Sequence, residues 1–128
     1  MKALFIIAFA LLTGVAIGAF SVQGLYAQTK PPAYVVTEIE ITNLDAYQKE
    51  YVPLAQASIR AAGGHLLAAG QNIVAFEGAP PQTRVSINQF DSLEATQNWR
   101  NSSQYKEARK VGDKYAKFRA FAVEGLSQ

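Results

Sequence analysis

Polar side chains that could bind a small molecule recur at alternate positions of two strand-like stretches. Glu38 and Glu40 alternate with apolar residues in YVVTEIEI, and Arg84, Ser86 and Asn88 do so in RVSINQF. Side chains two apart in a strand share one face, so adjacent strands would make the two sets neighbours. Because buried polar groups need partners, the pattern predicts an internal Glu–Arg pair, pairing across a dimer interface, or a wet pocket for a small ligand.

An aromatic side chain could complete the wall of such a pocket. Trp99 is the only tryptophan in the chain, and its spacing from Leu93 and Thr96 places it on the inward stripe of a helix. That spacing is also typical of a simple core residue. The candidate ligand-binding residues are therefore Glu38, Arg84, Asn88 and Trp99, and the sequence assigns no catalytic residue.

The stretch RAAGGHLLAAG holds His65, the only histidine in a chain without cysteine. No G-x-S-x-G turn and no second histidine or thiol accompanies it, so neither hydrolase chemistry nor a zinc site is indicated, and we expect no cofactor. Gly63 and Gly64 end a helix, which makes His65 a strand start, opposite Glu77 across a hairpin. We expect His65→Gln to change stability by at most about 1 kcal/mol. Arg84→Ala should cost more if a buried carboxylate pairs with Arg84.

Apolar periodicity and turn residues predict strands and amphipathic helices in alternation. Thr42 or Asn43 can cap a helix that continues to about Ala62, and Pro53 should bend or divide it. The expected elements are a strand at 34–41, this helix, two short strands within 65–78 around a turn at 70–72, a strand at 84–90, two helical pieces within 91–115 and a strand at 117–125. This order predicts an α+β domain of the ferredoxin-like, split βαβ kind, with the helices on one face of the sheet.

Helices on one face leave the other face of the sheet for water or for another subunit. The chain has no cysteine, so no disulfide supplements the core of a domain of about 100 residues. A twofold homodimer through the uncovered face is the expected arrangement. The polar residues could then serve only to specify pairing, which is the non-catalytic alternative to a ligand site.

The first 27 residues predict an export signal. Lys2 precedes eighteen uncharged residues at positions 3–20, and Ala27 is a small residue suited to cleavage. Eighteen apolar residues just reach the length of a bilayer span, so an uncleaved membrane anchor is the alternative. Such a protein would be periplasmic or secreted. Positions 28–32 then form a spacer, 33–125 the folded domain and 126–128 a tail.

The balance of charges gives no support for a nucleic-acid partner. The chain has 12 Lys and Arg against 10 Asp and Glu, and removal of the segment that contains Lys2 leaves 11 against 10. Nucleic-acid binding usually needs a concentrated basic face. The expected partners are therefore a second copy of the chain and a small organic ligand.

Several stretches together resemble the domain of unknown function 1330 family. They are AYVVTEIEITNLDAYQKEYVPLA, GGHLLAAG, FEG, RVSINQFDSLEATQNW and SSQYKEA, and they span nearly all of residues 33–125. The resemblance implies a dimeric α/β-barrel fold, related in shape to cofactor-free monooxygenases, and it implies no reaction. The expected function is binding of a small organic molecule in the barrel cavity. A non-catalytic dimer and a monooxygenase-like enzyme are the alternatives.

Overall fold

The structure is a computed structural model that describes residues 30–81 and 83–127. Residues Pro31–Leu126 form one compact unit. The predicted export signal and the first two residues of the predicted spacer lie outside the described residues. Within the described ranges, no helix is both long and apolar enough to cross a membrane.

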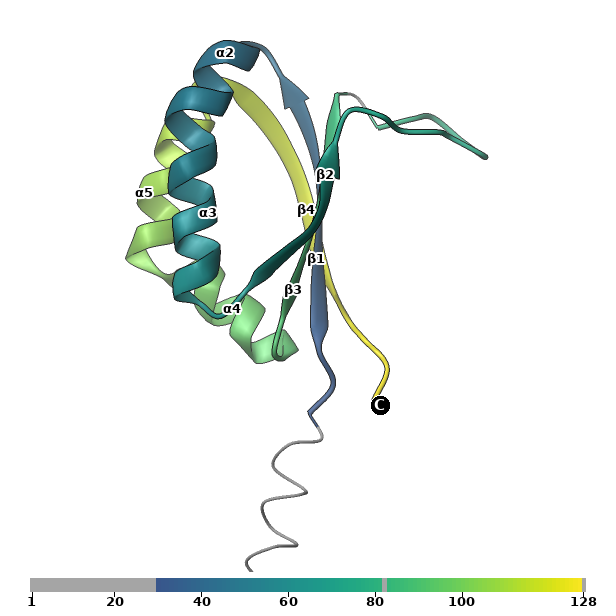
Figure 1. The fold of residues 1–128 in the computed structure, drawn as a ribbon, viewed down its shortest axis with the longest axis vertical. Helices are drawn as coiled ribbons and strands as arrows, with labels where there is room; N and C mark the ends of the chain where they lie inside the picture. The colour runs from purple at the N-terminus through teal and green to yellow at the C-terminus, as the bar shows by residue number, and fades with distance from the viewer. Residues whose placement is uncertain (1–29, 82, 128) are drawn as a thin grey trace, which may run out of the picture. The chain divides into compact units, whose positions relative to one another are not determined.

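Four strands form one antiparallel sheet. They are β1 (Ala33–Ile41), β2 (His65–Gly70), β3 (Arg84–Phe90) and β4 (Ala116–Glu124), and their order across the sheet is β2-β3-β1-β4. Figure 1 shows the helices gathered on one side of this sheet. Two helical crossovers on one face of a four-stranded antiparallel sheet make the ferredoxin-like arrangement, so the predicted α+β fold is confirmed.

The register between β1 and β3 decides which side chains share a face. Ile39 lies opposite Arg84, and Val35 lies opposite Asn88. Directly paired residues of antiparallel strands point to the same face. Val35 and Ile39 are each 3% exposed in the core beneath the helices, so Arg84 and Asn88 also point toward the helix layer. The opposite face, called the free face below, carries Val36, Glu38, Val85, Ile87, Arg119, Phe121 and Val123.

The first helical region contains a turn of π-helix. It comprises α2 (Leu44–Ala46), η1 (Tyr47–Tyr51) and α3 (Val52–Ala61). Asn43 caps it, because the Ala46 amide donates to the Asn43 Oδ1 at 3.1 Å. The Val52 amide bonds to the Tyr47 carbonyl, five residues back, just before Pro53, which has no amide hydrogen to donate. The predicted disturbance at Pro53 thus takes the form of a change in helix type.

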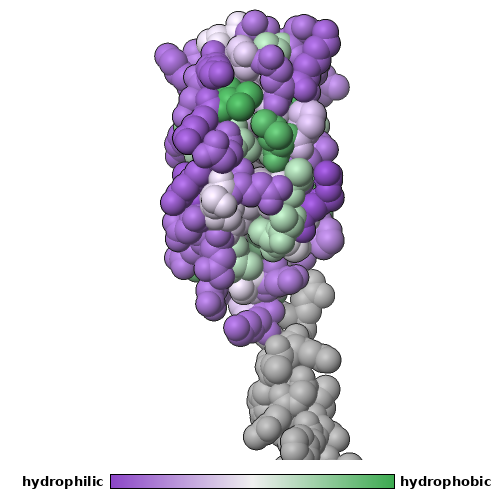
Figure 2. All heavy atoms as spheres, turned by 90° about the vertical axis from the view of Figure 1, so that its left-hand side faces the viewer, coloured by the Kyte–Doolittle hydropathy of each residue, from purple (hydrophilic) through white to green (hydrophobic). Residues whose placement is uncertain are grey.

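The second helical region and the first together cover one face of the sheet. The second region consists of α4 (Leu93–Asn101) and α5 (Ser103–Gly112). The hydroxyl of Ser102, which lies between them, accepts a hydrogen bond from the Tyr105 amide at 3.1 Å. Figure 2 shows that the outer surface of this layer is mostly hydrophilic, as amphipathic helices require. Two core clusters lie underneath, one with Val35, Ile59, Phe90, Trp99 and Tyr105, the other with Ile39, Tyr47, Tyr51, Ala108 and Ala116.

Two glycines join α3 to β2. Gly63 has a φ of +77°, the left-handed conformation that favours glycine. A Cβ on Gly64 would lie 2.7 Å from Ile59 Cγ2 and 2.8 Å from the Phe90 ring, so the backbone passes too close for a larger residue. The pair fixes where β2 begins, and His65 is its first residue, as predicted.

The predicted pairing of two short strands around residues 70–72 is wrong. β2 ends at Gly70 and pairs with β3, which places His65 opposite Gln89 and not opposite Glu77. A two-stranded hairpin outside a sheet is only marginally stable, whereas β3 gives β2 a row of backbone partners. The chain that follows β2, residues 71–81 (the projecting segment), extends from the sheet on the side away from the helices (Figure 1).

Candidate functional site

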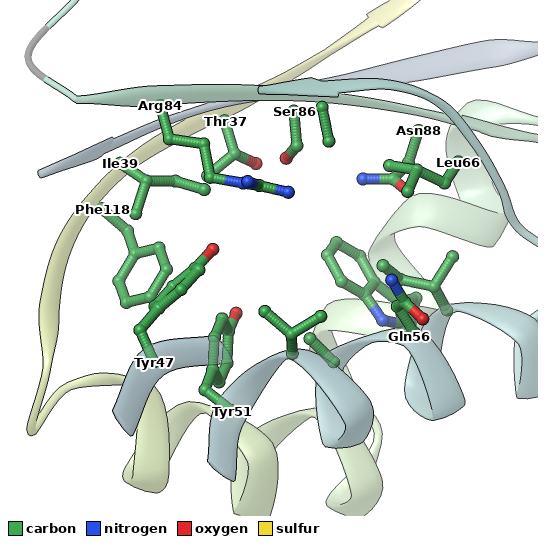
Figure 3. A pocket seen from close by; sticks show the side chains of 15 residues that line it. Thr37, Ile39, Tyr47, Tyr51, Gln56, Leu66, Arg84, Ser86, Asn88 and Phe118 are labelled. Carbon is green, nitrogen blue, oxygen red and sulfur yellow. The ribbon is translucent and has the colours of Figure 1, made fainter. Parts of the chain in front are cut away.

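A partly open cavity lies between the sheet and the helix layer (Figure 3). Its volume is about 70 Å³. One water needs roughly 10–15 Å³, and pockets for drug-sized ligands start near ~300 Å³. Leu66 and Gln56 line the cavity and are themselves partly exposed, which marks the side that meets solvent. The polar lining residues are Thr37, Tyr47, Tyr51, Gln56, Arg84, Ser86 and Asn88.

Strand β3 supplies three of these polar groups. Arg84, Ser86 and Asn88 occupy alternate positions of β3, and Figure 3 shows them pointing from the sheet into the cavity. Trp99 lines the same cavity from α4. Three of the four predicted ligand-binding residues, Arg84, Asn88 and Trp99, are therefore brought together.

Glu38, the fourth predicted residue, lies elsewhere. It is opposite Val85 in the β1–β3 register and opposite Arg119 in the β1–β4 register, on the free face. Its carboxylate accepts a hydrogen bond from Arg119 at 2.8 Å. The expectation that Glu38 neighbours Arg84 is wrong, because periodicity fixes faces within one strand, whereas the register between strands decides which faces coincide. Glu40, opposite Lys117, shares the free face with Glu38.

The Arg84 guanidinium is the only charged group among the described residues that line the cavity. The ion pairs found within the described part of the chain all involve other side chains. Burial raises the pKa of Tyr47, and the smaller opposing effect of the nearby Arg84 charge does not reverse this rise. Tyr47 therefore stays neutral at neutral pH and does not compensate the charge of Arg84.

Two tyrosines of η1 face Arg84 across the cavity. Figure 3 shows the hydroxyls of Tyr47 and Tyr51 pointing from the helix toward the sheet. Burial, with a further contribution from Tyr47, raises the pKa of Tyr51 far above its ordinary value. The ring of Tyr51 packs on Tyr47 and Phe118, with centroids 5.2 and 5.3 Å apart. Both hydroxyls thus remain protonated at neutral pH and can donate a hydrogen bond to a bound group.

Asn88 carries a buried acceptor without a partner. The residue is 3% exposed, and its Oδ1 has no hydrogen-bond partner among the described groups. Among the described residues, no other buried side-chain nitrogen or oxygen lacks a hydrogen-bond partner. Leaving a buried acceptor unpaired costs roughly 1–3 kcal/mol. The oxygen is closed off from solvent, and Figure 3 shows the amide nitrogen of Asn88 pointing into the cavity, where it could donate to a bound group.

Trp99 contributes a wall and no free polar group. Its indole N–H donates to Ser58 Oγ at 3.1 Å. Its ring packs against Phe90 and Tyr105, with centroid separations of 5.2 and 4.6 Å. Because the single donor of the indole is already used, Trp99 can offer a ligand only its aromatic ring.

Tyr47 and Tyr51 were not among the site residues predicted from the sequence. They are four apart, a spacing that a core-facing helix stripe produces equally well. Two hydroxyl-bearing rings on a helix opposite an arginine-bearing strand were a usable signal. Its use, however, required knowing that η1 packs over β3.

His65 lies away from the cavity. It is exposed on β2 and shares a face with Gln89, which alternation assigns to the free face. Within residues 30–81 and 83–127, no group of three or more His, Cys, Asp or Glu side chains could hold a metal ion. His65 therefore takes no part in the chemistry of the cavity.

Residues 32–126 match the sequence profile of a family described as "Domain of unknown function (DUF1330)". The chain belongs to the DUF1330 family. The matched range agrees with the region over which the sequence resembles this family, so that resemblance is confirmed. No curated protein matches this DUF1330 chain in sequence.

Solved structures share the fold of this DUF1330 domain at low sequence identity. A protein of unknown function from Rhodopseudomonas palustris has a TM-score of 0.56 at 16% identity, over 86% of this chain and 94% of that one. SnoaB, a cofactor-independent oxygenase from Streptomyces nogalater, has a TM-score of 0.56 at 8% identity, over 77% and 96%. An ethyl tert-butyl ether d (ethd) family protein from Bacillus halodurans has a TM-score of 0.55 at 15% identity, over 75% and 99%. These likenesses show the fold alone.

Replacing Arg84 by methionine should leave the free energy of unfolding within about 1 kcal/mol of the wild-type value. The sequence-based expectation of a larger cost required a buried carboxylate partner, and the described cavity residues include none. Urea unfolding measures the change, and His65→Gln, at an exposed position, is the matched control. A loss of several kcal/mol in Arg84→Met alone would mean that Arg84 stabilises the fold through a partner.

Proposed function

We propose that this DUF1330 protein binds a small organic molecule in the cavity beneath the helix layer. The observation that carries the proposal is the Arg84 guanidinium, which lines this cavity with no carboxylate beside it among the described residues. Buried polar groups with a purely structural role are normally satisfied within the fold. Apolar walls around a few convergent polar groups are the usual composition of small-molecule sites.

The non-catalytic alternative places the polar residues of β3 at a dimer interface. That interpretation requires Arg84 and Asn88 to lie on the free face, where a second subunit would pack. They point instead toward the helices of their own subunit. Their position therefore supports a ligand site within each subunit, beneath the helices and away from the sheet face that would line a dimeric barrel.

An enzyme version of the proposal is oxygenation of the bound molecule without a cofactor. SnoaB, which shares the fold, is a cofactor-independent oxygenase. At 8% identity this likeness transfers no catalytic residue to the chain. Binding is therefore the function that we propose.

A set of small compounds that runs from acetate-sized molecules to single rings, with anionic, neutral and cationic members, should include binders of the wild-type protein, because the cavity volume is about 70 Å³. Ala55 lines the cavity from α3. The larger side chain of Ala55→Leu would compete with a ligand for the cavity, so we expect binding to weaken about tenfold or more, a loss of ~1.4 kcal/mol. Ligand-detected saturation-transfer NMR measures this.

The matched control for this experiment is Ala61→Leu, the same substitution at an exposed position of α3 outside the cavity lining. It should bind like the wild type. Equal binding to the wild type and to Ala55→Leu would contradict a site in this cavity.

We propose in addition that two copies of the domain pair through the free face. The centre of this face carries Val36, Val85 and Ile87 beside the exposed Phe121 and Val123, which are 47% and 51% exposed. A contiguous apolar surface of this kind is typical of an interaction site. A second copy is the proposed occupant because a twofold axis places the same apolar patch against itself.

The projecting segment supports the same pairing. It extends on the side of the sheet that has no helices (Figure 1). Val74 and Phe76 in this segment are 76% and 93% exposed. A second copy on the free face would lie beside the segment and could cover these apolar side chains, which a monomer leaves in water.

Phe121→Asp should convert the homodimer into a monomer, because it places a charge in the apolar centre of the proposed interface. Light scattering should report twice the chain mass for the wild type and the single chain mass for the variant. Leu54→Asp is the control, since Leu54 is similarly exposed, at 44%, but lies on α3 in the helix layer. A wild-type monomer at micromolar concentration would refute the pairing.

We propose finally that the domain works outside the cytoplasm. Lys2, the uncharged run at positions 3–20 and the small residue Ala27 support an export signal that is removed after Ala27. Intact-mass measurement of the protein recovered from its native cells should give a chain that begins at Gln28. A membrane-bound form that retains residues 1–27 would favour the anchor instead.

A further inference from the structure

We infer that the cavity binds the carboxylate of a short-chain organic acid, of the size of acetate or propionate. The inference rests on the proposed function and names the chemical class and the size of its ligand. Three observations carry it, namely an arginine without an acidic partner, a described lining whose polar side chains can all donate hydrogen bonds, and the small volume of the cavity.

The Arg84 guanidinium calls for an anion. It is the only charged group among the described residues that line the cavity. Glu38, whose carboxylate bonds to Arg119, lies on the opposite face of the sheet. A planar guanidinium matches a carboxylate with two parallel hydrogen bonds. One arginine balances one negative charge, which favours a carboxylate over a phosphate dianion.

The sheet offers further donors beside the guanidinium. Thr37 and Ser86 lie opposite each other in the β1–β3 register, and both line the cavity. Figure 3 shows the amide nitrogen of Asn88 pointing into the same space. An ionised carboxylate has oxygens that only accept hydrogen bonds, so hydroxyl and amide donors suit it. The sheet side of the cavity therefore presents a positive charge and neutral donors to one bound group.

The helix layer adds two donors from the other side. The hydroxyls of Tyr47 and Tyr51 point across the cavity toward Arg84 (Figure 3), and both stay protonated at neutral pH. A protonated phenol can donate its hydrogen to a carboxylate oxygen that the guanidinium leaves free. An anion in the cavity thus meets donors from the sheet and from the helices.

The volume of the cavity limits the size of the acid. An engineered apolar protein cavity of roughly 150 Å³ binds benzene. The cavity here has a volume of about 70 Å³, in proportion room for roughly three to five non-hydrogen atoms. Acetate and propionate are of this size, whereas an acid built on an aromatic ring is too large to be enclosed.

The apolar part of the lining favours an organic acid over an inorganic anion. Val52 and Ala55 of α3 and Leu66 of β2 line the cavity together with the polar groups. An inorganic anion would leave these side chains without an apolar contact. The alkyl tail of a short acid would bury apolar surface against them, which adds to the affinity.

Four compounds test the inference on the wild-type protein. Propionate should bind about tenfold or more tighter than propionamide, which has the same shape and no charge. It should also bind several-fold tighter than nitrate, a planar anion without a tail, and than benzoate, which carries the same carboxylate on a ring. Because such small ligands bind weakly, the affinities are measured by NMR chemical-shift titration into the millimolar range at constant pH and ionic strength.

Variants assign the preference for the acid to the cavity. Arg84→Met should bind propionate about tenfold or more weakly and no better than propionamide, and Tyr51→Phe should weaken propionate several-fold. Arg60→Met is the matched control, since it removes the same charge from an exposed position of α3 outside the cavity lining. It should bind propionate like the wild type. Thermal melts establish that each variant is folded, and Arg84→Gln provides the same comparison if Arg84→Met does not fold.

The outcomes separate the inference from the proposed function. Equal wild-type affinity for propionate and propionamide, an acid preference that persists in Arg84→Met, or an equal loss in Arg60→Met would overturn the inference while binding in the cavity stands. Nitrate or benzoate binding as tightly as propionate would overturn the assigned class or size of the ligand. If acids fail while neutral or cationic compounds bind and Ala55→Leu blocks them, the inference alone is wrong. If no compound binds in the cavity, both proposals fail.

Discussion

The pairing register of β1 with β3 is the constraint on which the candidate site and the free face both depend. It places Asn88 opposite Val35 and Arg84 opposite Ile39, so the polar positions of β3 lie beneath the helices. A slip of one residue would exchange the two sets of side chains between the faces. The cavity would then be lined by Val85 and its neighbours, and the arginine would point away from the helices. The cavity and the apolar free face are therefore two consequences of one alignment.

The helix layer that packs over these strands departs locally from the α-helix. The bond from the Val52 amide to the Tyr47 carbonyl makes η1 a π-helical turn, and Pro53 follows directly. A proline interrupts the regular ladder, and a wider turn accommodates this without ending the helix. The turn is also where Tyr47 and Tyr51 enter the cavity. Proline thus sets both the irregularity and the place where two aromatic hydroxyls face Arg84.

Most of the fold was predictable because each strand and helix has a strong periodic pattern, and glycines 63 and 64 mark a sharp boundary before β2. Alternation also identified Arg84 and Asn88 as residues of one face. It could not place Glu38, because its face relative to β3 depends on the register between strands. The predicted hairpin was wrong for a related reason. The turn-like sequence Gly70-Gln71-Asn72 does not reveal that β2 pairs with β3 instead of with the residues that follow the turn. Contacts between segments that are distant in the chain, such as the packing of η1 over β3, produce no periodic pattern in the sequence.

The polarity of β3 is the reverse of that of an ordinary strand with one solvated face. An interior strand of such a sheet turns apolar residues to the core and polar residues to water, but β3 turns Ser86 and Asn88 to the helices and Val85 and Ile87 to the free face. Each half of this reversal costs stability, since polar groups are buried and apolar groups are exposed. A ligand would offset the first cost and a second copy the second. Because both sets of side chains alternate along one strand, the register that turns Arg84 and Asn88 toward the helices also turns Val85 and Ile87 to the free face.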